Sequence, residues 1–239
     1  METLALMTGI DIPVPELQLA IHQPTIKEIS MIGEKDFFIG AQTLCLNKSL
    51  YIQDETLLSQ TTNFQIFMTM MQNKESVMTK GCVLKVLQLI MPNAQALFTP
   101  RAVMLNLGDH SVNIDESNFE TLQAILKDIF CLKESGQEAF NPANEEAKKI
   151  AEKLMRGRQR VAAQKAKDGG DSIFTQYLSI LTIGLESMGL DKLINLTMFQ
   201  LYDLVERYML YSNWDLDVRQ RLAGGKPDSE PENWMKPIH

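Results

Sequence analysis

The feature that most restricts the fold is a long amphipathic segment that begins at Met198. Thr197 precedes it and is suited to cap the free amide groups of a first helical turn. The apolar residues recur at spacings of three and four, the period of one face of an α-helix, and they are Met198, Leu201, Tyr202, Val205, Tyr208 and Met209. Because isolated helices are marginal in water, this segment requires a body against which its apolar face can pack.

The composition is that of a globular protein that can supply such a body. The chain has 239 residues, of which 45% are hydrophobic, enough for one large domain or two small ones. Its formal net charge is −7, whereas a general nucleic-acid-binding protein needs a basic surface to neutralise phosphates. We therefore expect nucleic-acid binding only from a local basic segment, if at all.

The sequence also predicts a cytoplasmic protein without membrane association. Residues 1–17 lack the basic start and continuous apolar core of a signal peptide, and no run approaches the ~18–20 apolar residues of a membrane helix. The cysteines Cys45, Cys82 and Cys131 are far apart and odd in number, which is typical of free thiols in a reducing compartment.

Motifs for catalysis, metal binding and nucleotide binding are missing from the sequence. The histidines His22, His110 and His239 do not stand near a cysteine, serine or carboxylate at a recognised catalytic or metal-binding spacing. Neither the G-x-x-x-x-G-K-[ST] pattern nor the G-x-G-x-x-G pattern occurs. We expect a protein that is not an enzyme and that uses no cofactor.

The first 135 residues predict a mixed domain of short strands and helices. Residues 9–15 are punctuated by proline and should be extended, and residues 17–21 alternate like a short strand. Thr25 and Glu28 have the spacing of a capping box, so a helix should begin there and end near Gly33. A second helix should follow and run toward residue 47.

Two long helical patterns come next in the same domain. Apolar periodicity indicates one helix or two abutting helices over residues 54–71, and a further helix over residues 75–91. The first pattern carries several methionines, which fill irregular gaps in a core or line adaptable binding surfaces. Core filling is the favoured interpretation, and the alternative assigns partner contacts to Met68, Met70 and Met71.

A β-hairpin is predicted near the centre of the chain. Apolar stretches at residues 96–98 and 102–107 flank a proline-containing turn, and a third stretch follows at 112–114. Ser117 is expected to cap the helix after it. Together these elements predict an α+β fold that is predominantly α-helical, with small strand elements in the N-terminal half and helices in the C-terminal half.

Residues 142–168 are predicted to form a basic connector helix after a polar loop that marks the domain boundary. Its basic patch consists of Lys148, Lys149, Lys153, Arg156 and Arg160. These cations favour a helix that faces solvent or a partner, including a second copy of this acidic chain. Contact with phosphates is the weaker alternative, because glutamates dilute the charge and no aromatic residue is interleaved for base stacking.

The rest of the chain is predicted as a helical unit, residues 171–225, and an extended tail, residues 226–239. The unit should begin with a helix over residues 172–188 that ends at Gly189 in a left-handed cap. Trp214 has helical spacing from apolar neighbours, so we expect it to lie partly in the core.

Trp234 lies in the tail among three prolines, where no long helix can form. We expect an acidic spacer to hold Trp234 and Met235 away from the body, as an anchor for a partner. The competing interpretation is that Trp234 folds back and covers Leu210 and Tyr211, which lie outside the main apolar stripe of the last helix.

The end of the chain resembles a known protein family. After the long helix come Ala223-Gly224-Gly225-Lys226, an acidic spacer and Glu232-Asn233-Trp234-Met235-Lys236. This order resembles the C-terminal signature of tail assembly chaperones and related small tail-morphogenesis proteins of long-tailed bacteriophages. In the N-terminal half, Pro24-Thr25-Ile26-Lys27-Glu28-Ile29 followed by Ile32-Gly33-Glu34 is similar to a pattern common among phage tail-gene products.

The resemblance implies an assembly factor in the cytoplasm of the infected host cell. Such a factor binds an immature tail protein, for example the tape measure or the tube subunit, and leaves before the virion is complete. The methionine-rich helices and the tail with Trp234 and Met235 would supply the contacts. Two alternatives stay open, namely a structural protein of the tail or baseplate that remains in the virion and a nucleic-acid-associated factor that acts through the basic helix.

Overall fold

Helices dominate the structure, and the strands are confined to the N-terminal half, as the sequence predicts. The computed structural model describes residues 3–108, 110–132, 172–185, 187–225 and 233–235. In chain order its elements, with η for a 3-10 helix, are α1 (Thr3–Thr8), β1 (Ile12–Val14), η1 (Pro15–Leu17), β2 (Leu19–Ile21), α2 (Ile26–Ile32), α3 (Glu34–Leu44), η2 (Lys48–Leu50), α4 (Glu55–Gln60), α5 (Asn63–Gln72), η3 (Lys74–Ser76), α6 (Val77–Ile90), β3 (Gln95–Phe98), β4 (Val103–Asn106), β5 (Ser111–Ile114), α7 (Phe119–Ile129), α9 (Ile173–Gly184), α10 (Leu190–Leu193) and α11 (Met198–Leu222).

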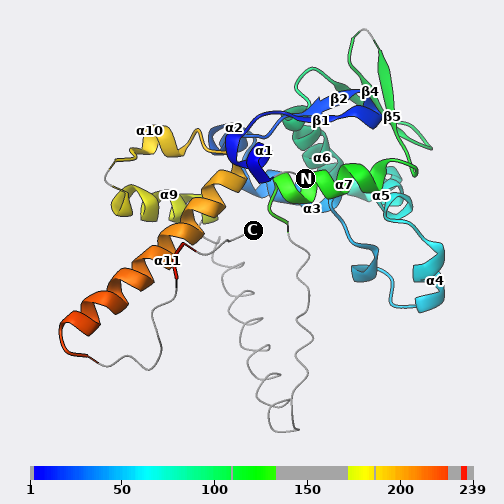
Figure 1. Cartoon of the computed structure of the whole chain (residues 1–239). Helices are drawn as coiled ribbons and strands as arrows, with labels where there is room; N and C mark the ends of the chain where they lie inside the picture. The colour runs from blue at the N-terminus through cyan, green and yellow to red at the C-terminus, as the bar shows by residue number, and fades with distance from the viewer. Residues whose placement is uncertain (1–2, 109, 133–171, 186, 226–232, 236–239) are drawn as a thin grey trace, which may run out of the picture.

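Two small antiparallel sheets account for the strands. β1 pairs with β2, so that Ile12 lies opposite Ile21, and β3, β4 and β5 form a meander in that order. In the meander Val103, Leu105 and Ile114 point into the core, while their neighbours on the strands are more exposed. This sheet and the helices α9 to α11 lie at opposite ends of the molecule (Figure 1).

The centre of the core is the contact between α3 and α6. Gly40 on α3 faces the backbone of α6 so closely that a Cβ at this position would lie 2.5 Å from the carbonyl oxygen of Cys82 and 2.7 Å from a methyl group of Val86. Phe37, one turn earlier on α3, is fully buried and meets Phe130 edge to face, with 5.2 Å between ring centroids. The absent side chain at Gly40 therefore sets the distance between the two helices.

A buried glutamine connects three further elements. Gln123 on α7 donates through Nε2 to the carbonyl oxygens of Leu44 and Leu46 at 2.7 and 3.2 Å, at the end of α3. Its Oε1 accepts from Asn63 Nδ2 at the start of α5, at 3.2 Å. Both polar ends of the buried side chain are thus satisfied, as burial requires.

The N-termini of α2 and α11 lie side by side. Each has a complete capping box, formed by Thr25 with Glu28 and by Thr197 with Gln200, and Thr25 and Thr197 form an antiparallel bridge. The amides of residues 26 and 27, which a helix start leaves without partners, donate to the carbonyl oxygens of residues 196 and 194 at 2.9 and 2.8 Å.

The described residues on both sides of the predicted domain boundary share one core. Phe174, Leu181, Leu201 and Val205 from the C-terminal part are buried in the same cluster as α3, α6 and α7. Phe174 stacks on Phe38 with 5.6 Å between ring centroids. The predicted connector helix, residues 142–168, and its basic patch lie outside the described residues.

Most predicted helix boundaries are confirmed, and two are wrong. The pattern over residues 54–71 resolves into two helices, α4 and α5. The helix after the hairpin begins at Phe119 with Asn118, not Ser117, at the N-cap, because Ser117 is held in a turn by Asp115. Gly189 is not the left-handed end of α9, which stops at Gly184; Gly189 has φ −70° and precedes α10.

The α3–α6 contact provides a stability test with a matched control. Gly40→Ala should lower the free energy of unfolding by about 1–3 kcal/mol, because the backbone of α6 cannot yield easily to an added methyl group. Gly81→Ala, on α6, meets nothing within 4 Å and should raise it by about 0.5–1 kcal/mol through helix propensity. Urea denaturation of the two variants measures both changes, and equal shifts in one direction would contradict this packing.

Candidate interaction surface

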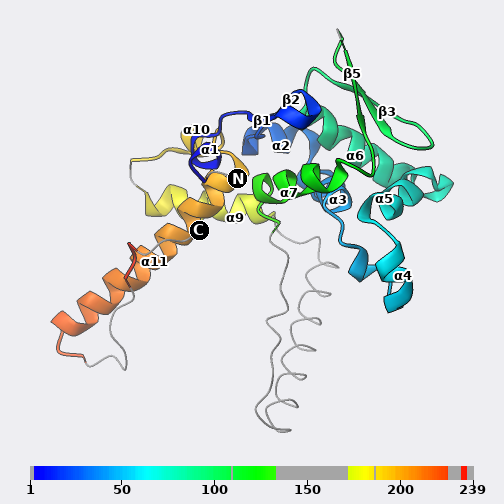
Figure 2. The ribbon, with the colours of Figure 1, turned by 45° about the vertical axis from the view of Figure 1, so that its right-hand side comes forward.

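The C-terminal half of α11 leaves the core. The buried residues of this helix end at Val205, whereas Met209, Leu216 and Leu222 expose 53%, 66% and 83% of their surface. Both views of the ribbon show this half projecting away from α3, α6 and α7 (Figures 1 and 2). Met209, expected on the packed face, is exposed because the body ends before the helix does.

An aromatic cluster covers one side of this projecting half. Tyr211, Trp214 and Trp234 form it, with ring-centroid distances of 6.0 Å between Tyr211 and Trp214, 5.4 Å between Tyr211 and Trp234, and 6.3 Å between the two tryptophans. Tyr211 and Trp234 meet edge to face, a favoured geometry of aromatic pairs. Arg207 Nη1 donates to the carbonyl oxygen of Trp234 at 2.7 Å.

The end of α11 turns the chain back toward this cluster. Gly224 has φ +86°, and the amides of Gly224 and Gly225 donate to the carbonyl oxygens of Arg221 and Gln220 at 3.0 and 2.9 Å. These two bonds form a Schellman motif, which needs a residue in the left-handed region and so favours glycine. The segment of residues 233–235 then lies beside α11 in both ribbon views.

The prediction that the tail is held away from the body is therefore wrong for Trp234. The competing interpretation is confirmed for Tyr211, on which Trp234 packs. Trp214 is half-buried, but it packs on Tyr211 and Trp234 and not in the core, so that expectation is wrong. Met235 exposes 69% of its surface. The contact of Arg207 with Trp234 could not be foreseen from the sequence, because the acceptor is a backbone carbonyl that is distant along the chain.

The predicted methionine contacts lie elsewhere. Met68 and Met71 on α5 are buried in the core and Met70 is half-buried, so they fill space, as the favoured interpretation held. In Figure 1, α5 and α11 lie on opposite sides of the body. The structure thus brings Trp214, Trp234 and Met235 together on one side of the molecule, apart from the methionines of α5. The basic patch from Lys148 to Arg160 lies outside the described residues.

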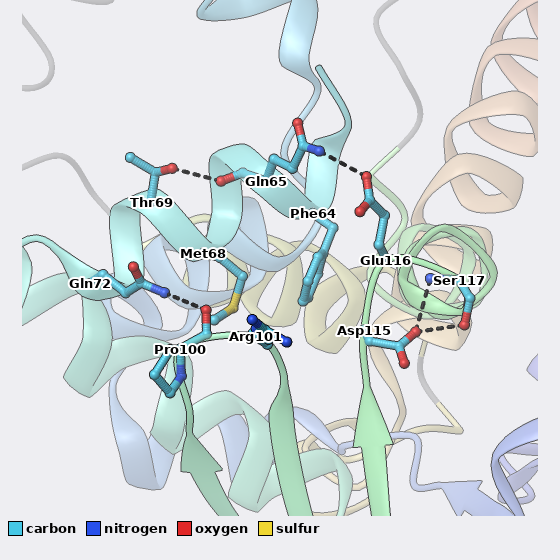
Figure 3. A pocket seen from close by; sticks show the side chains of 10 residues that line it. All are labelled: Phe64, Gln65, Met68, Thr69, Gln72, Pro100, Arg101, Asp115, Glu116 and Ser117. Atoms are coloured by element: carbon cyan, nitrogen blue, oxygen red, sulfur yellow. Dashed lines mark hydrogen bonds between the residues drawn. The ribbon is translucent and has the colours of Figure 1, made fainter. Parts of the chain in front are cut away.

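An open depression of about 620 Å³ lies between α5, the β3–β4 turn and the segment after β5. Its floor is apolar and its rim polar, and the lining residues are Phe64, Gln65, Met68, Thr69, Gln72, Pro100, Arg101, Asp115, Glu116 and Ser117 (Figure 3). Gln72 Nε2 donates to the carbonyl oxygen of Pro100 at 2.9 Å and fixes one edge.

The carboxylates at this rim are engaged within the protein. Glu116 Oε1 accepts from Thr62 Oγ1 and Gln65 Nε2 at 2.9 and 3.0 Å. Asp115 Oδ1 accepts from the hydroxyl and the amide of Ser117, and these bonds hold the pKa of Asp115 below its usual range. The bonds tie the segment after β5 to α5 and explain the depression as a structural junction.

His22 lies between two carboxylates, which the sequence analysis did not foresee. Its Nδ1 is 2.9 Å from Asp11 Oδ1 and its Nε2 is 3.3 Å from Glu28 Oε2. Burial, the largest single effect, favours the neutral ring, but the hydrogen bonds and charges of the two carboxylates outweigh it and raise the pKa of His22. With both ring nitrogens engaged, the imidazole is arranged to hold a proton rather than to accept one from a substrate.

The remaining reactive groups are packed in the core or apart from one another. All three cysteines are free thiols, as predicted, and burial raises the pKa of Cys45 to about 12. Within the described ranges no group of three or more His, Cys, Asp or Glu side chains is placed to hold a metal ion. Of the helices described, none combines the length and hydropathy needed to cross a membrane.

Comparisons with known protein families, curated proteins and solved structures found no match for the chain.

The ion pairs of His22 predict a pH-dependent stability. Because the folded-state pKa is raised above 6.5, their contribution is fully present below pH 6.5 and is lost as the pH rises through the folded-state pKa. His22→Gln should therefore be less stable than the wild type at pH 5.5, by less than about 1 kcal/mol because the site is partly exposed, and the difference should vanish by pH 8.5.

Urea denaturation at the two pH values measures this difference. Asp11→Asn should lose part of it, because one of the two carboxylates remains. A difference that is the same at pH 5.5 and pH 8.5 would contradict the assignment of a protonated His22.

Proposed function

We propose that the protein is a non-enzymatic assembly factor of a phage tail that binds an immature tail protein, such as the tape measure or the tube subunit, in the manner of a chaperone. The C-terminal signature supports the choice of partner. The observation that carries the binding role is the projecting half of α11, which has no buried residue after Val205 and bears the aromatic cluster.

The composition of this surface suits protein binding. Tryptophan, tyrosine and arginine are the residues that most often dominate the energy of protein interfaces, and Arg207, Tyr211 and Trp214 lie within two turns of one helix. Leu216 and Met235 add exposed apolar area at the same end of the molecule. Asp215 and Arg219, 2.8 Å apart, give this area a polar edge.

A chaperone-like role fits the contrast between this surface and the body. The core is closed around α3 and α6, so binding through α11 does not require the fold to open. An unfinished tail protein exposes apolar surface before it assembles, and a projecting helix can cover such surface without enclosing it.

The alternative of a structural protein of the tail or baseplate makes use of the same surface and differs in its fate. Mass spectrometry of purified virions separates the two, because an assembly factor is absent from the particle and a structural protein is present. The nucleic-acid alternative rests on residues outside the described part of the chain, and no observation on the described residues favours it.

Substitution of Trp214 tests the binding role directly. Trp214→Ala should weaken the binding of the co-expressed tape measure or tube protein by about 2 kcal/mol, or roughly 30-fold, as expected for an interface anchor. The melting temperature should change little, because Trp214 lies outside the core. Affinity is measured by titration of the purified proteins, and stability by circular dichroism.

Tyr51→Ala provides the matched control. Tyr51 is also an exposed aromatic residue, with 55% of its surface accessible, but it follows η2 in the segment that leads to α4. In Figure 1, α4 and α11 lie on opposite sides of the body. Equal affinity of the two variants for the tail protein would remove the aromatic cluster from the proposed interface.

A further inference from the structure

We infer that Arg207, Tyr211 and Trp214 form a docking surface on one side of α11 for an extended, tryptophan-bearing segment of a partner, and that Trp234 of the same chain occupies this docking surface until the partner displaces it. The inference rests on the proposed function in that the partner is the bound tail protein. It assigns Trp234 the role of a placeholder, in contrast to the sequence-based prediction that Trp234 itself anchors the partner.

The contacts of Trp234 define what the docking surface recognises. Arg207 binds a main-chain carbonyl oxygen at 2.7 Å, and Tyr211 and Trp214 receive the indole ring at centroid distances of 5.4 and 6.3 Å. None of these contacts uses a feature peculiar to this chain. A carbonyl and an aromatic ring on an extended backbone, supplied by another protein, satisfy the same groups.

The tail is long enough to reach the docking surface. From Arg207 to Leu222 the helix rises by roughly 22 Å at 1.5 Å per residue. The chain from Gly225 to Trp234 spans at most roughly 30 Å when fully extended. The extended tail can therefore span the distance to the docking surface on α11 of the same chain, with little length to spare.

The placeholder is held loosely enough to be displaced. Trp234 is half-buried rather than buried, and Asn233 and Met235 on either side of it are exposed. The amide of Met235 donates to Asn233 Oδ1 at 3.0 Å, a bond within this short segment. A partner segment can gain additional contacts that the tail does not make, because Leu210 and Val218 lie on the same side of the helix and are only half-buried.

The tether determines how tightly a free segment has to bind. A short flexible tether presents the tail at an effective concentration of about 1 mM. If the tail occupies the docking surface most of the time, the same residues offered as a separate peptide should bind with a Kd below about 1 mM. The placeholder should weaken the binding of that peptide to the intact protein.

A peptide titration tests the inference with the full chain. The probe is a fluorescein-labelled peptide of residues 230–239, and the proteins are the wild type, Trp234→Ala and Met235→Ala. We expect the peptide to bind Trp234→Ala with a Kd below about 0.1 mM and at least about 10-fold more tightly than the wild type, because a tethered tail at about 1 mM then weakens wild-type binding by that factor. Fluorescence anisotropy measures both affinities. Met235→Ala, altered at the adjacent exposed residue, should behave as the wild type does.

Two controls establish where the peptide binds. A peptide with alanine in place of its tryptophan should not bind. The double variant Arg207→Ala, Trp234→Ala should bind the unaltered peptide at least about 10-fold more weakly than Trp234→Ala, because the donor to the main-chain carbonyl is removed. Circular dichroism of each variant verifies that the helix is retained.

The outcomes that overturn the inference are distinct. Equal affinity of the wild type and Trp234→Ala for the peptide would show that the tail does not occupy the docking surface. Failure of a folded Trp234→Ala to bind the peptide at 1 mM would show that these residues form no docking surface. A concentration-dependent wild-type dimer that Trp234→Ala abolishes would place the tail on a second copy instead.

The proposed function is tested separately, because the titration contains no tail protein. If the peptide binds as expected and the tail protein binds neither the wild type nor Trp234→Ala, the inferred docking surface is retained and its partner is a different protein. If the tail protein binds but Trp234→Ala does not increase its affinity, the assembly role remains and the placeholder is excluded.

Discussion

The pairing of two helix starts is the constraint on which the arrangement of the described structure depends. The first amides of α2 have no partner inside their own helix and donate to residues 194 and 196, just before α11. Since these bonds join main-chain groups, they fix the start of α11 against the N-terminal part whatever the neighbouring side chains are. Thr25 and Thr197 cap the two helices on either side of the junction.

Both capping boxes also hold the N-terminal segment. Glu28, the third residue of α2, accepts from Thr25 and is in addition the partner of His22, whose other nitrogen contacts Asp11. Gln200, the third residue of α11, donates to the carbonyl oxygen of Met7 at 2.7 Å. Each box thus serves as a cap and as a link to residues 7–22, so local and tertiary stability are coupled here.

The same junction explains why the exposed surface is on α11. With its start fixed beside α2, this helix packs on the core through about its first three turns, as far as Tyr208. There the ring of Tyr208 lies so close to Gly184 of α9 that a side chain at Gly184 would collide with it. The following turns extend beyond the body and carry the aromatic cluster. A rigid base and a projecting, partly covered end are what a surface needs to bind a partner without loss of the fold.

The sequence by itself determined most of the elements: the capping box at Thr25, the cap at Thr197, the hairpin and the mostly helical α+β class all follow from local patterns that a few neighbouring residues decide. It left the position of Trp234 as a choice between two interpretations and gave no sign that His22 would lie between Asp11 and Glu28. These features depend on groups that are distant along the chain, as when Arg207 meets the carbonyl of Trp234. Only the tertiary structure decided them, because the direction in which the chain returns after Gly224 and the point at which the body stops covering α11 are set by packing and not by periodicity.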